Sequence, residues 1–276
     1  MPASTPVPTN LAAFQGDKYA DAWAAQWKKG ESLPWDEGFP NPALEDALVN
    51  HKATIGEAIG HDAQGQPYRR KALVPGCGRG VDVLLLASFG FDAYGLEYSP
   101  DAIEACKKEE KENHSWYRAR DQAVGPGKVN WVQGDFFDDA WLKKIGVSHF
   151  DVVYDYTFFC ALSPSMRPRW ALRQTQLLAP SPSGNLICLE FPRHKSPSEA
   201  GPPWASPSEA YMEHLSHPGE EVHYNDQGLV KENPLQPPSK AGLERVAFWQ
   251  PERTHEKGQG KDGVIHDRVS IWRRRN

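Results

Sequence analysis

The sequence predicts an α/β fold, in which a mostly parallel sheet carries helices on both faces. Short apolar runs alternate along the chain with segments of helical character, a pattern typical of parallel strands joined by crossover helices. The first such run, at 72–74, leads into Gly-Cys-Gly-Arg-Gly at 76–80. A glycine-rich turn after a first strand is where doubly wound sheets hold nucleotide-like ligands. At 276 residues, the chain is long enough to bury a sizeable core.

Composition narrows the class of protein. The formal net charge of −5 argues against a nucleic-acid partner, which normally leaves a basic footprint. No apolar stretch approaches the roughly 20 residues of a membrane span, and residues 1–10 lack the pattern of a secretory signal. The four cysteines have neither paired nor metal-ligand spacing. We therefore expect free thiols, no metal and a cytoplasmic protein.

We expect a flexible tail over 1–16 and a single domain over 17–276. An N-terminal helical cap over 17–60 contains a helix at 17–29, a loop rich in glycine and proline, and a helix at 43–59. Residues 60–70 are expected to form a polar connection to the sheet.

The strands of the sheet are expected where apolar runs end in glycine or in acidic residues. They are 71–74, 91–96, 129–133, 150–154 and 185–191. The segments between them predict helices at 81–89, 100–113 and 166–178, and an irregular stretch at 115–128. Ser99 is suited to cap the second of these helices, with Pro100 at its first position. Two further strands, 245–250 and 268–272, are expected to form an antiparallel hairpin at one edge of the sheet.

The segment 192–219, rich in Pro, Ser and Gly, allows two interpretations. It is either a surface insertion or a lid over the mouth of the sheet, because it follows the carboxyl end of a core strand. A short helix is expected within it at 208–215.

Two acidic residues end strands on the side where open α/β sheets bind ligands. Glu97 lies 21 positions after Gly76, a spacing that suits hydrogen bonds from both hydroxyls of a ribose. Asp135 ends the third strand and is suited to accept a proton of an exocyclic adenine amine, with Phe136 against the ring. The spacing of Gly76, Gly78 and Gly80 is shorter than in dinucleotide-binding turns and is typical of class I S-adenosylmethionine methyltransferases.

Aromatic residues form a second group of candidates. Trp23 and Trp27 share a helix face, which on its own is more often core than binding site. Trp35 stands in a loop among prolines, and an indole face attracts a cation such as a sulfonium by about 2 kcal/mol or more once water is excluded.

The stretch 155–160, Asp-Tyr-Thr-Phe-Phe-Cys, follows the strand expected beside the first one. It suggests an aromatic pocket that is poor in bases, suited to an acceptor that is already anionic. A hydroxyl on Tyr156 could then steer the acceptor. His194 is a weaker candidate for a general base.

Several long motifs between residues 19 and 211 carry a family resemblance. They are Trp23-x-x-x-Trp27, Pro34-Trp35-Asp36-x-Gly38, Ala72-Leu73-Val74-Pro75-Gly76-Cys77-Gly78, Asp135-Phe136-Phe137, Phe150-Asp151-Val152-Val153-Tyr154-Asp155-Tyr156-x-Phe158-Phe159-Cys160-Ala161-Leu162 and Met166-Arg167-Pro168-x-Trp170. With them the chain resembles the thiopurine S-methyltransferase-like family, with the nearest likeness to the plant and fungal halide/thiol methyltransferases. It departs from the plant members by one extra residue between Trp27 and Trp35 and by Glu97 in place of Asp.

The resemblance implies a class I methyltransferase fold with S-adenosyl-L-methionine as donor and S-adenosyl-L-homocysteine as product. Together with the reasoning above, it predicts the donor-binding residues Trp23, Trp27, Trp35, Gly76, Gly78, Glu97, Asp135, Phe136, Asp155 and Tyr156. Tyr156 and Trp35 are predicted to be catalytic, and the acceptor pocket to comprise Trp35, Tyr156, Phe159 and Cys160.

The resemblance also implies methyl transfer to halide ions (iodide, bromide, chloride) or to small thiols such as bisulfide or thiocyanate. In-line displacement without a base would suit these acceptors. The alternative is an S-methyltransferase for a larger aromatic or secondary-metabolite thiol, which needs an open apolar mouth near 192–204. A nicotinamide-dependent dehydrogenase and a module that senses the donor without using it are rivals from other classes.

Overall fold

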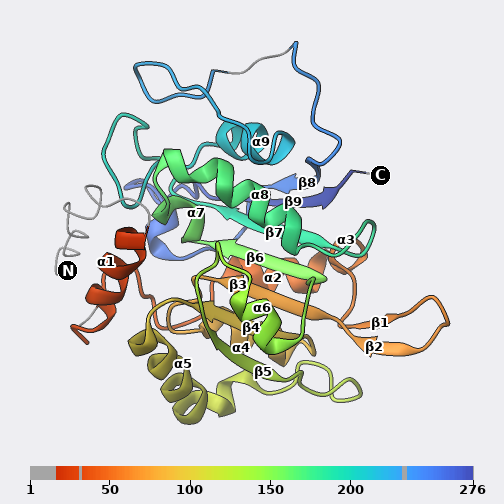
Figure 1. Cartoon of the computed structure of the whole chain (residues 1–276). Coiled ribbons are helices and arrows are strands. Elements are labelled where there is room, and N and C mark those ends of the chain that lie inside the picture. The colour runs from red at the N-terminus through yellow and green to blue at the C-terminus, as the bar shows by residue number, and fades with distance from the viewer. Residues whose placement is uncertain (1–16, 31–32, 232–234, 276) are drawn as a thin grey trace.

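A computed structural model describes residues 17–30, 33–231 and 235–275. The predicted tail at 1–16 lies outside them. The expected α/β fold is confirmed (Figure 1): a seven-stranded sheet has the order β5-β4-β3-β6-β7-β9-β8. Its strands are β3 (Lys71–Pro75), β4 (Asp92–Glu97), β5 (Val129–Gln133), β6 (Val152–Tyr156), β7 (Asn185–Glu190), β8 (Leu243–Trp249) and β9 (Arg268–Arg274). The first five pair in parallel, and β9 pairs antiparallel with β7 and β8, as expected for the C-terminal hairpin.

Helices cover both faces of the sheet. The longer ones are α1 (Asp17–Trp27), α2 (Pro42–Asn50), α4 (Val81–Ser88), α5 (Pro100–Asn113), α8 (Arg167–Leu177) and α9 (Ser208–Ser216). Alternate residues of β3 point to opposite faces. Ala72 and Val74 join a core with α2 and α4, whereas Leu73 joins a second core with α8 and α9. Among the described residues, no helix combines the length and the apolar character that crossing a bilayer requires.

Two N-terminal predictions are wrong in detail. The helix expected over 43–59 breaks at His51 into α2 and α3 (Lys52–Ile55), because the backbone of His51 (φ −115°, ψ 28°) leaves the helical region. Gly56, with φ of 85°, ends α3. The expected polar connection contains a small hairpin, β1 (Ile59–His61) and β2 (Pro67–Arg69), which projects from the end of the molecule opposite α1 (Figure 1).

The predicted fourth strand is shifted by two residues. β6 runs through Tyr156, so Asp155 and Tyr156 lie within the strand rather than after it. Phe150, expected to begin the strand, instead bridges to Leu178 beyond the end of α8. Two short helices next to this region have no counterpart in the prediction, α6 (Ala140–Ile145) and α7 (Phe158–Ala161).

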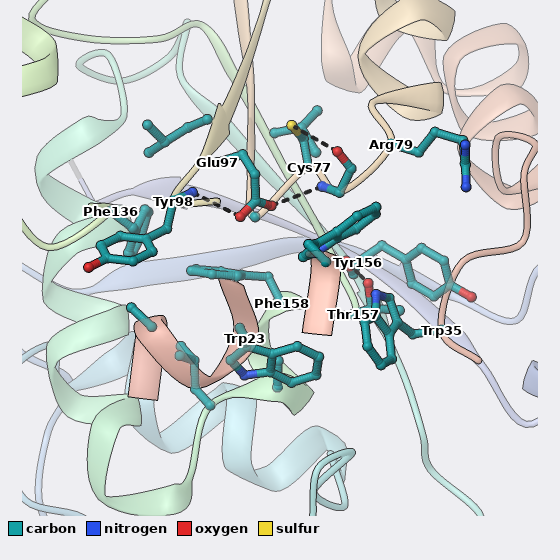
Figure 2. A pocket seen from close by; sticks show the side chains of 18 of the residues that line it. Trp23, Trp35, Cys77, Arg79, Glu97, Tyr98, Phe136, Tyr156, Thr157 and Phe158 are labelled. Carbon is teal, nitrogen blue, oxygen red and sulfur yellow. Dashed lines mark hydrogen bonds between the residues drawn. The ribbon is translucent and has the colours of Figure 1, made fainter. Parts of the chain in front are cut away.

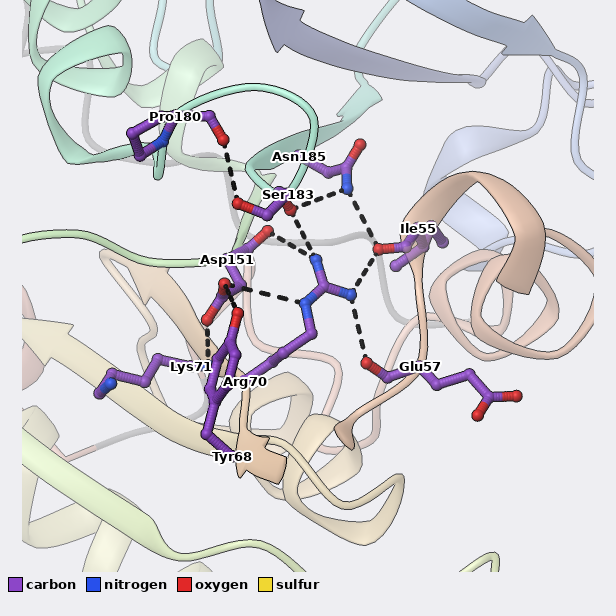
Figure 3. Close-up of polar contacts among 9 residues, drawn as sticks. All are labelled: Ile55, Glu57, Tyr68, Arg70, Lys71, Asp151, Pro180, Ser183 and Asn185. Carbon is purple, nitrogen blue, oxygen red and sulfur yellow. Dashed lines mark hydrogen bonds and ion pairs between the residues drawn. The ribbon is translucent and has the colours of Figure 1, made fainter. Parts of the chain in front are cut away.

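A buried arginine lies at the amino ends of the central strands β3 and β6 (Figure 3). The guanidinium of Arg70 donates to the carbonyl oxygens of Ile55, Asp151 and Ser183 at 2.7, 3.2 and 2.6 Å. Its Nε lies 3.8 Å from Oδ1 of Asp151. These contacts fasten the end of the N-terminal cap to the amino ends of β3 and β6.

Candidate active site

A cavity lies at the carboxyl ends of β3, β4, β5 and β6 (Figure 2). Helix α1 and the loop at 33–39 form its outer wall. The cavity brings together nine of the predicted site residues: Trp23, Trp27, Trp35, Gly76, Gly78, Glu97, Asp135, Phe136 and Tyr156. Figure 2 shows Tyr98 and Phe136 at one end, and Tyr156, Thr157 and Trp35 at the other.

The glycine turn comes close to the aromatic side chains of the cavity. Gly76 and Gly78 have φ of 58° and 56°, in the left-handed region that favours glycine. A Cβ at Gly76 would lie 2.4 Å from the ring of Phe158, and one at Gly78 would lie 3.1 Å from Trp27. The turn therefore needs glycine for both its conformation and its packing.

Glu97, at the end of β4, is held by backbone N–H groups. Gly78 N donates to Oε2 at 3.1 Å, while Tyr98 N and Ser99 N donate to Oε1 at 2.8 and 3.2 Å. Burial raises the pKa of Glu97, and these three hydrogen bonds oppose that rise. A carboxylate has about four acceptor sites, so about one remains, on Oε2. Glu97 is thus positioned to accept one hydroxyl of a ligand rather than the two expected from the sequence.

At the other predicted strand end, the side chain of Asp135 accepts Phe137 N–H at 2.9 Å. Phe136 is buried, and its ring meets that of Phe158 edge-on with centroids 5.0 Å apart. This arrangement leaves one Asp135 oxygen beside an aromatic wall, a combination suited to a flat, amine-bearing ring.

Three tryptophans from two segments meet in the outer wall. The ring of Trp35 lies edge-on to those of Trp23 and Trp27, with centroids 5.0 and 6.4 Å away. The loop that carries Trp35 is tied to the glycine turn, because Nε of Arg79 donates to Oδ2 of Asp36 at 2.7 Å. An aromatic enclosure of this kind attracts a cation.

Asp155, predicted to bind the donor, does not line the cavity. Its position in β6 directs it to the opposite face from Tyr156. There its carboxylate accepts Phe159 N, Trp170 Nε1 and Gln174 Nε2 at 3.0, 2.7 and 3.1 Å. Burial raises the pKa of Asp155 to about 6. Through these three hydrogen bonds, the carboxylate of Asp155 joins α7 and α8 to the sheet.

Phe159 and Cys160, predicted to line the acceptor pocket, also lie outside the cavity. The left-handed φ of 62° at Thr157 turns the chain sharply into α7. As a result Phe158 faces the cavity, whereas Phe159 packs against Trp170 and Tyr211 in the second core. Burial raises the pKa of the Cys160 thiol to about 12, so this group is not a nucleophile at neutral pH.

Sequence reasoning missed His255, which lies in the loop between β8 and β9. Its Nδ1 is 3.0 Å from the hydroxyl of Tyr156, and both residues line the cavity. No local motif marks His255, because the fold alone brings it to β6. His194, the candidate base, lies outside the cavity lining, with its ring 5.5 Å from that of His266.

The segment 192–219 lines no part of this cavity. It contains α9, as expected, and its remainder is anchored to α7 and α8: Trp204 N donates to Cys160 O at 2.7 Å, and Arg167 Nη2 donates to Ala205 O at 2.9 Å. These contacts tie the segment to the body of the protein, and its action as a lid stays a prediction.

A family model described as thiopurine S-methyltransferase matches residues 18–251. Curated proteins similar to the chain include "Probable thiol methyltransferase 2" of Arabidopsis thaliana, 30% identical over 87% of this chain and 89% of that protein. "Thiocyanate methyltransferase 1" of the same plant is 30% identical over 89% of this chain and 91% of that protein. "Thiopurine S-methyltransferase" of Pseudomonas paraeruginosa is 28% identical over 71% of this chain and 82% of that protein.

Solved structures show the same fold at low sequence identity. One is the Burkholderia thailandensis 1,6-didemethyltoxoflavin-N1-methyltransferase, with a TM-score of 0.55, 15% identity, and coverage of 100% of this chain and 94% of that one. Another comes from work on the conversion of a disulfide bond into a thioacetal group in echinomycin biosynthesis. Its TM-score is 0.57 at 16% identity, over 92% of each chain.

Proposed function

Because the chain belongs to the thiopurine S-methyltransferase family and is an S-adenosylmethionine-dependent methyltransferase, we propose that it methylates a halide ion or a small thiol. The acceptors in question are iodide, bromide, chloride, bisulfide and thiocyanate. One observation carries the proposal: a cavity with tryptophan walls at the carboxyl ends of the strands also holds Tyr156 at one end.

The cavity suits the donor in shape and in charge. The turn at Gly76 and Gly78 provides a cradle that a Cβ would fill, and Glu97 offers an acceptor for a ribose hydroxyl. We assign Asp135 and Phe136 to the adenine. When bound, the donor supplies a methyl group activated by a positively charged sulfur.

We propose that the tryptophan side chains in the cavity wall attract that positive charge. Trp23, Trp27 and Trp35 would favour the cationic donor over its neutral product, which promotes product release. Very tight binding of the cation would slow the reaction, because the charge declines in the transition state. Aromatic contacts are weaker than a carboxylate against the sulfur and therefore suit the task better.

For the acceptor, we assign Tyr156 and Trp35 to positioning and to exclusion of water. Tyr156 is 9% exposed, so an acceptor beside it would lose much of its hydration. Good alignment of two reacting groups can supply about 7–11 kcal/mol of the barrier. The alternative of a bulky aromatic thiol depended on an open mouth near 192–204, and that segment does not contribute to the cavity.

We also propose that the protein works in the cytosol. All four cysteines are free thiols, and Cys106, Cys160 and Cys188 are buried, as is typical of a reducing compartment.

A headspace assay tests the proposal. The purified protein is incubated with the donor and, separately, with each halide, bisulfide or thiocyanate, and the vapour is analysed. We expect methylated volatile products that require both donor and protein. If the donor binds in calorimetry but no acceptor is methylated, a sensing module is favoured; binding of a nicotinamide cofactor in place of the donor would favour a dehydrogenase.

A further inference from the structure

We propose that Tyr156 and His255 form a proton relay that takes the proton of a neutral thiol, so that the preferred acceptor is a thiol rather than a halide. The inference rests on the proposed function and specifies its acceptor. It replaces the expectation that Tyr156 steers an anion through its hydroxyl proton.

The carbonyl of Phe39 is the basis for the tautomer that we assign to His255, and the carbonyl of Pro40 also acts on this ring. Nε2 of His255 lies 3.2 Å from the oxygen of Phe39, which can only accept a hydrogen bond. Nε2 therefore carries the proton. Burial lowers the pKa of His255, which favours the neutral ring, and in that ring Nδ1 has no proton. Across the 3.0 Å contact, the hydroxyl of Tyr156 must then donate to Nδ1.

A second neighbour occupies one of the two acceptor positions on the Tyr156 hydroxyl oxygen. The side chain of Asn41 lies beside it and lowers the pKa of Tyr156, as a hydrogen-bond donor to the phenol oxygen does. Oδ1 of Asn41 already accepts Ala43 N–H at 2.9 Å, and Nδ2 already donates to Oγ1 of Thr254 at 3.2 Å. The second hydrogen of the amide NH₂ group is therefore the one that we assign to Tyr156. The phenol oxygen thus donates once and accepts once, and one lone pair remains. A lone pair accepts an S–H proton and repels an anion.

Charges around the cavity favour a neutral acceptor in the same way. Two acidic residues of the lining are paired: Asp36 with Arg79, and Glu37 with Lys257 at 2.6 Å. Three others, Asp82, Glu97 and Asp135, form no ion pair with Lys or Arg within the described part of the chain.

Against this excess of acidic groups, one further cation lines the cavity among the described residues: Arg169, whose guanidinium lies over the ring of Phe137 with 4.7 Å to its centroid. Burial raises the pKa of Asp82 to about 7 and also raises that of Glu97, so the lining repels a halide most strongly at the higher pH at which these groups are ionised. A thiol that is still protonated has no charge to be repelled.

The proton and electrons balance as follows. The thiol S–H bond breaks and its proton passes to Oη of Tyr156, while the hydroxyl proton of Tyr156 passes to Nδ1 of His255. The electron pair left on the thiol sulfur forms the new bond to the methyl carbon. The bond between that carbon and the donor sulfur breaks, and its electron pair neutralises the sulfonium. His255 ends as an imidazolium and releases its extra proton to water.

Four charged or titratable groups surround the relay. Glu37 and Lys257 act on His255 in opposite directions and pair with each other. Asp82 on α4 and Asp267 before β9 act on Tyr156. They raise the pKa of Tyr156 and so oppose its ionisation, which suits a hydroxyl that gains one proton as it passes on another.

The first test needs no turnover. Nitrogen-15 NMR of the whole protein at neutral pH, with the His255 signals assigned by comparison with His255→Gln, reads the tautomer directly. We expect a proton on Nε2, a bare Nδ1 and titration below the ordinary pKa of about 6.5. A proton on Nδ1, or a charged ring at neutral pH, would overturn the relay, because the Tyr156 hydroxyl would then be free to face an anion.

The second test compares acceptors. In His255→Gln, hydrogen bonding remains possible but proton uptake is lost. We expect the ratio of alkyl-thiol to iodide turnover to fall by about 100-fold, the usual scale of general base catalysis. The matched variant His194→Gln, outside the cavity lining, should leave this ratio unchanged.

The pH profile separates a relay from a purely structural role. In the wild type, thiol kcat/KM should fall as pH drops through the pKa of His255, iodide turnover should not, and His255→Gln should lack this limb. An unchanged ratio, or an equal loss for both acceptors, would overturn the relay while the methyltransferase assignment stands. If the wild type methylates neither acceptor, the proposed function fails as well.

Discussion

The hydroxyl of Tyr156, on β6, lies 3.0 Å from Nδ1 of His255, which follows it by 99 positions in the chain. The antiparallel strands β8 and β9 produce this contact, since their connecting loop returns over the carboxyl ends of the parallel strands. A C-terminal hairpin at the edge of the sheet thereby completes a cavity whose other lining residues lie between positions 19 and 169.

Removing only the hydroxyl of this pair should affect turnover more than donor binding. Tyr156→Phe keeps the ring in the cavity wall but has no group to accept or pass a proton. We expect alkyl-thiol turnover to fall by 10-fold or more, with the calorimetric Kd of the donor changed by less than about 3-fold. Tyr154→Phe is the matched control, because the Tyr154 hydroxyl is buried and has no hydrogen-bond partner within the described residues. A larger effect of Tyr156→Phe on donor affinity than on turnover would contradict the role assigned to Tyr156.

Loss of the Glu97 carboxylate should weaken donor binding. In Glu97→Ala, a hydrogen bond to a ribose hydroxyl is lost together with the anchor of Gly78 N. A hydrogen bond to a charged group is worth about 1.5–3 kcal/mol, so we expect the donor Kd to rise by roughly 10- to 150-fold. Calorimetry measures it, with Glu104→Ala on the exposed face of α5 as control. Equal donor affinity in Glu97→Ala and wild type would refute the ribose contact.

The glycine turn can be tested with two alanine variants. Gly65→Ala, at a φ of 76° with open space around it, isolates the backbone strain, about 1–2 kcal/mol. Gly76→Ala adds a Cβ 2.4 Å from Phe158, and such overpacking adds about 1–3 kcal/mol. We expect urea unfolding to show the larger loss in Gly76→Ala, and donor binding to fall in that variant alone. Equal losses of stability would mean that Phe158 moves aside.

Asp82 predicts a pH dependence of stability. Burial raises its pKa to about 7, above the ordinary value of about 3.9. Between these values the native state binds more protons than the unfolded state, so the free energy of unfolding declines as pH rises through that window. Asp82→Asn keeps an acceptor for Asn41 N–H and carries no charge to desolvate.

We therefore expect the free energy of unfolding of Asp82→Asn, relative to that of the wild type, to increase as the pH is raised from 4 to 8. Each pKa unit is worth about 1.4 kcal/mol, which gives a few kcal/mol in total. Urea unfolding at the two pH values measures the gain, and Asp101→Asn, exposed on α5, should show none. A gain that is the same at both pH values would be inconsistent with the raised pKa.

Much of the sheet could be predicted because each strand carries its own signal. An apolar run that ends in glycine or an acidic residue marks β3, β4 and β5, and Ser99 followed by Pro100 marks the start of α5. The structure confirms that cap, since the Ser99 side chain accepts Ala102 N–H at 3.3 Å. The part of the cavity that we assign to the donor was predictable for the same reason, because Glu97 and Asp135 lie directly at strand ends.

The acceptor side was harder to predict because its geometry is not local. A positive φ at Thr157, which is unusual for a β-branched residue, decides that Phe158 rather than Phe159 faces the cavity. Strand alternation across a shifted β6 places Asp155 on the opposite face. His255 reaches Tyr156 only through the pairing of β9 with β7, and no spacing in the sequence reveals that pairing.

The most direct measurement supplies the purified protein with donor carrying a carbon-13 methyl group and offers an alkyl thiol and iodide in parallel. Both acceptors are followed by NMR. We expect the label on the thiol sulfur, with one S-adenosylhomocysteine formed for each methyl transferred, and thiol turnover exceeding that of iodide at neutral pH. A label that stays on bound donor in the presence of every thiol and halide would contradict methyl transfer at this cavity.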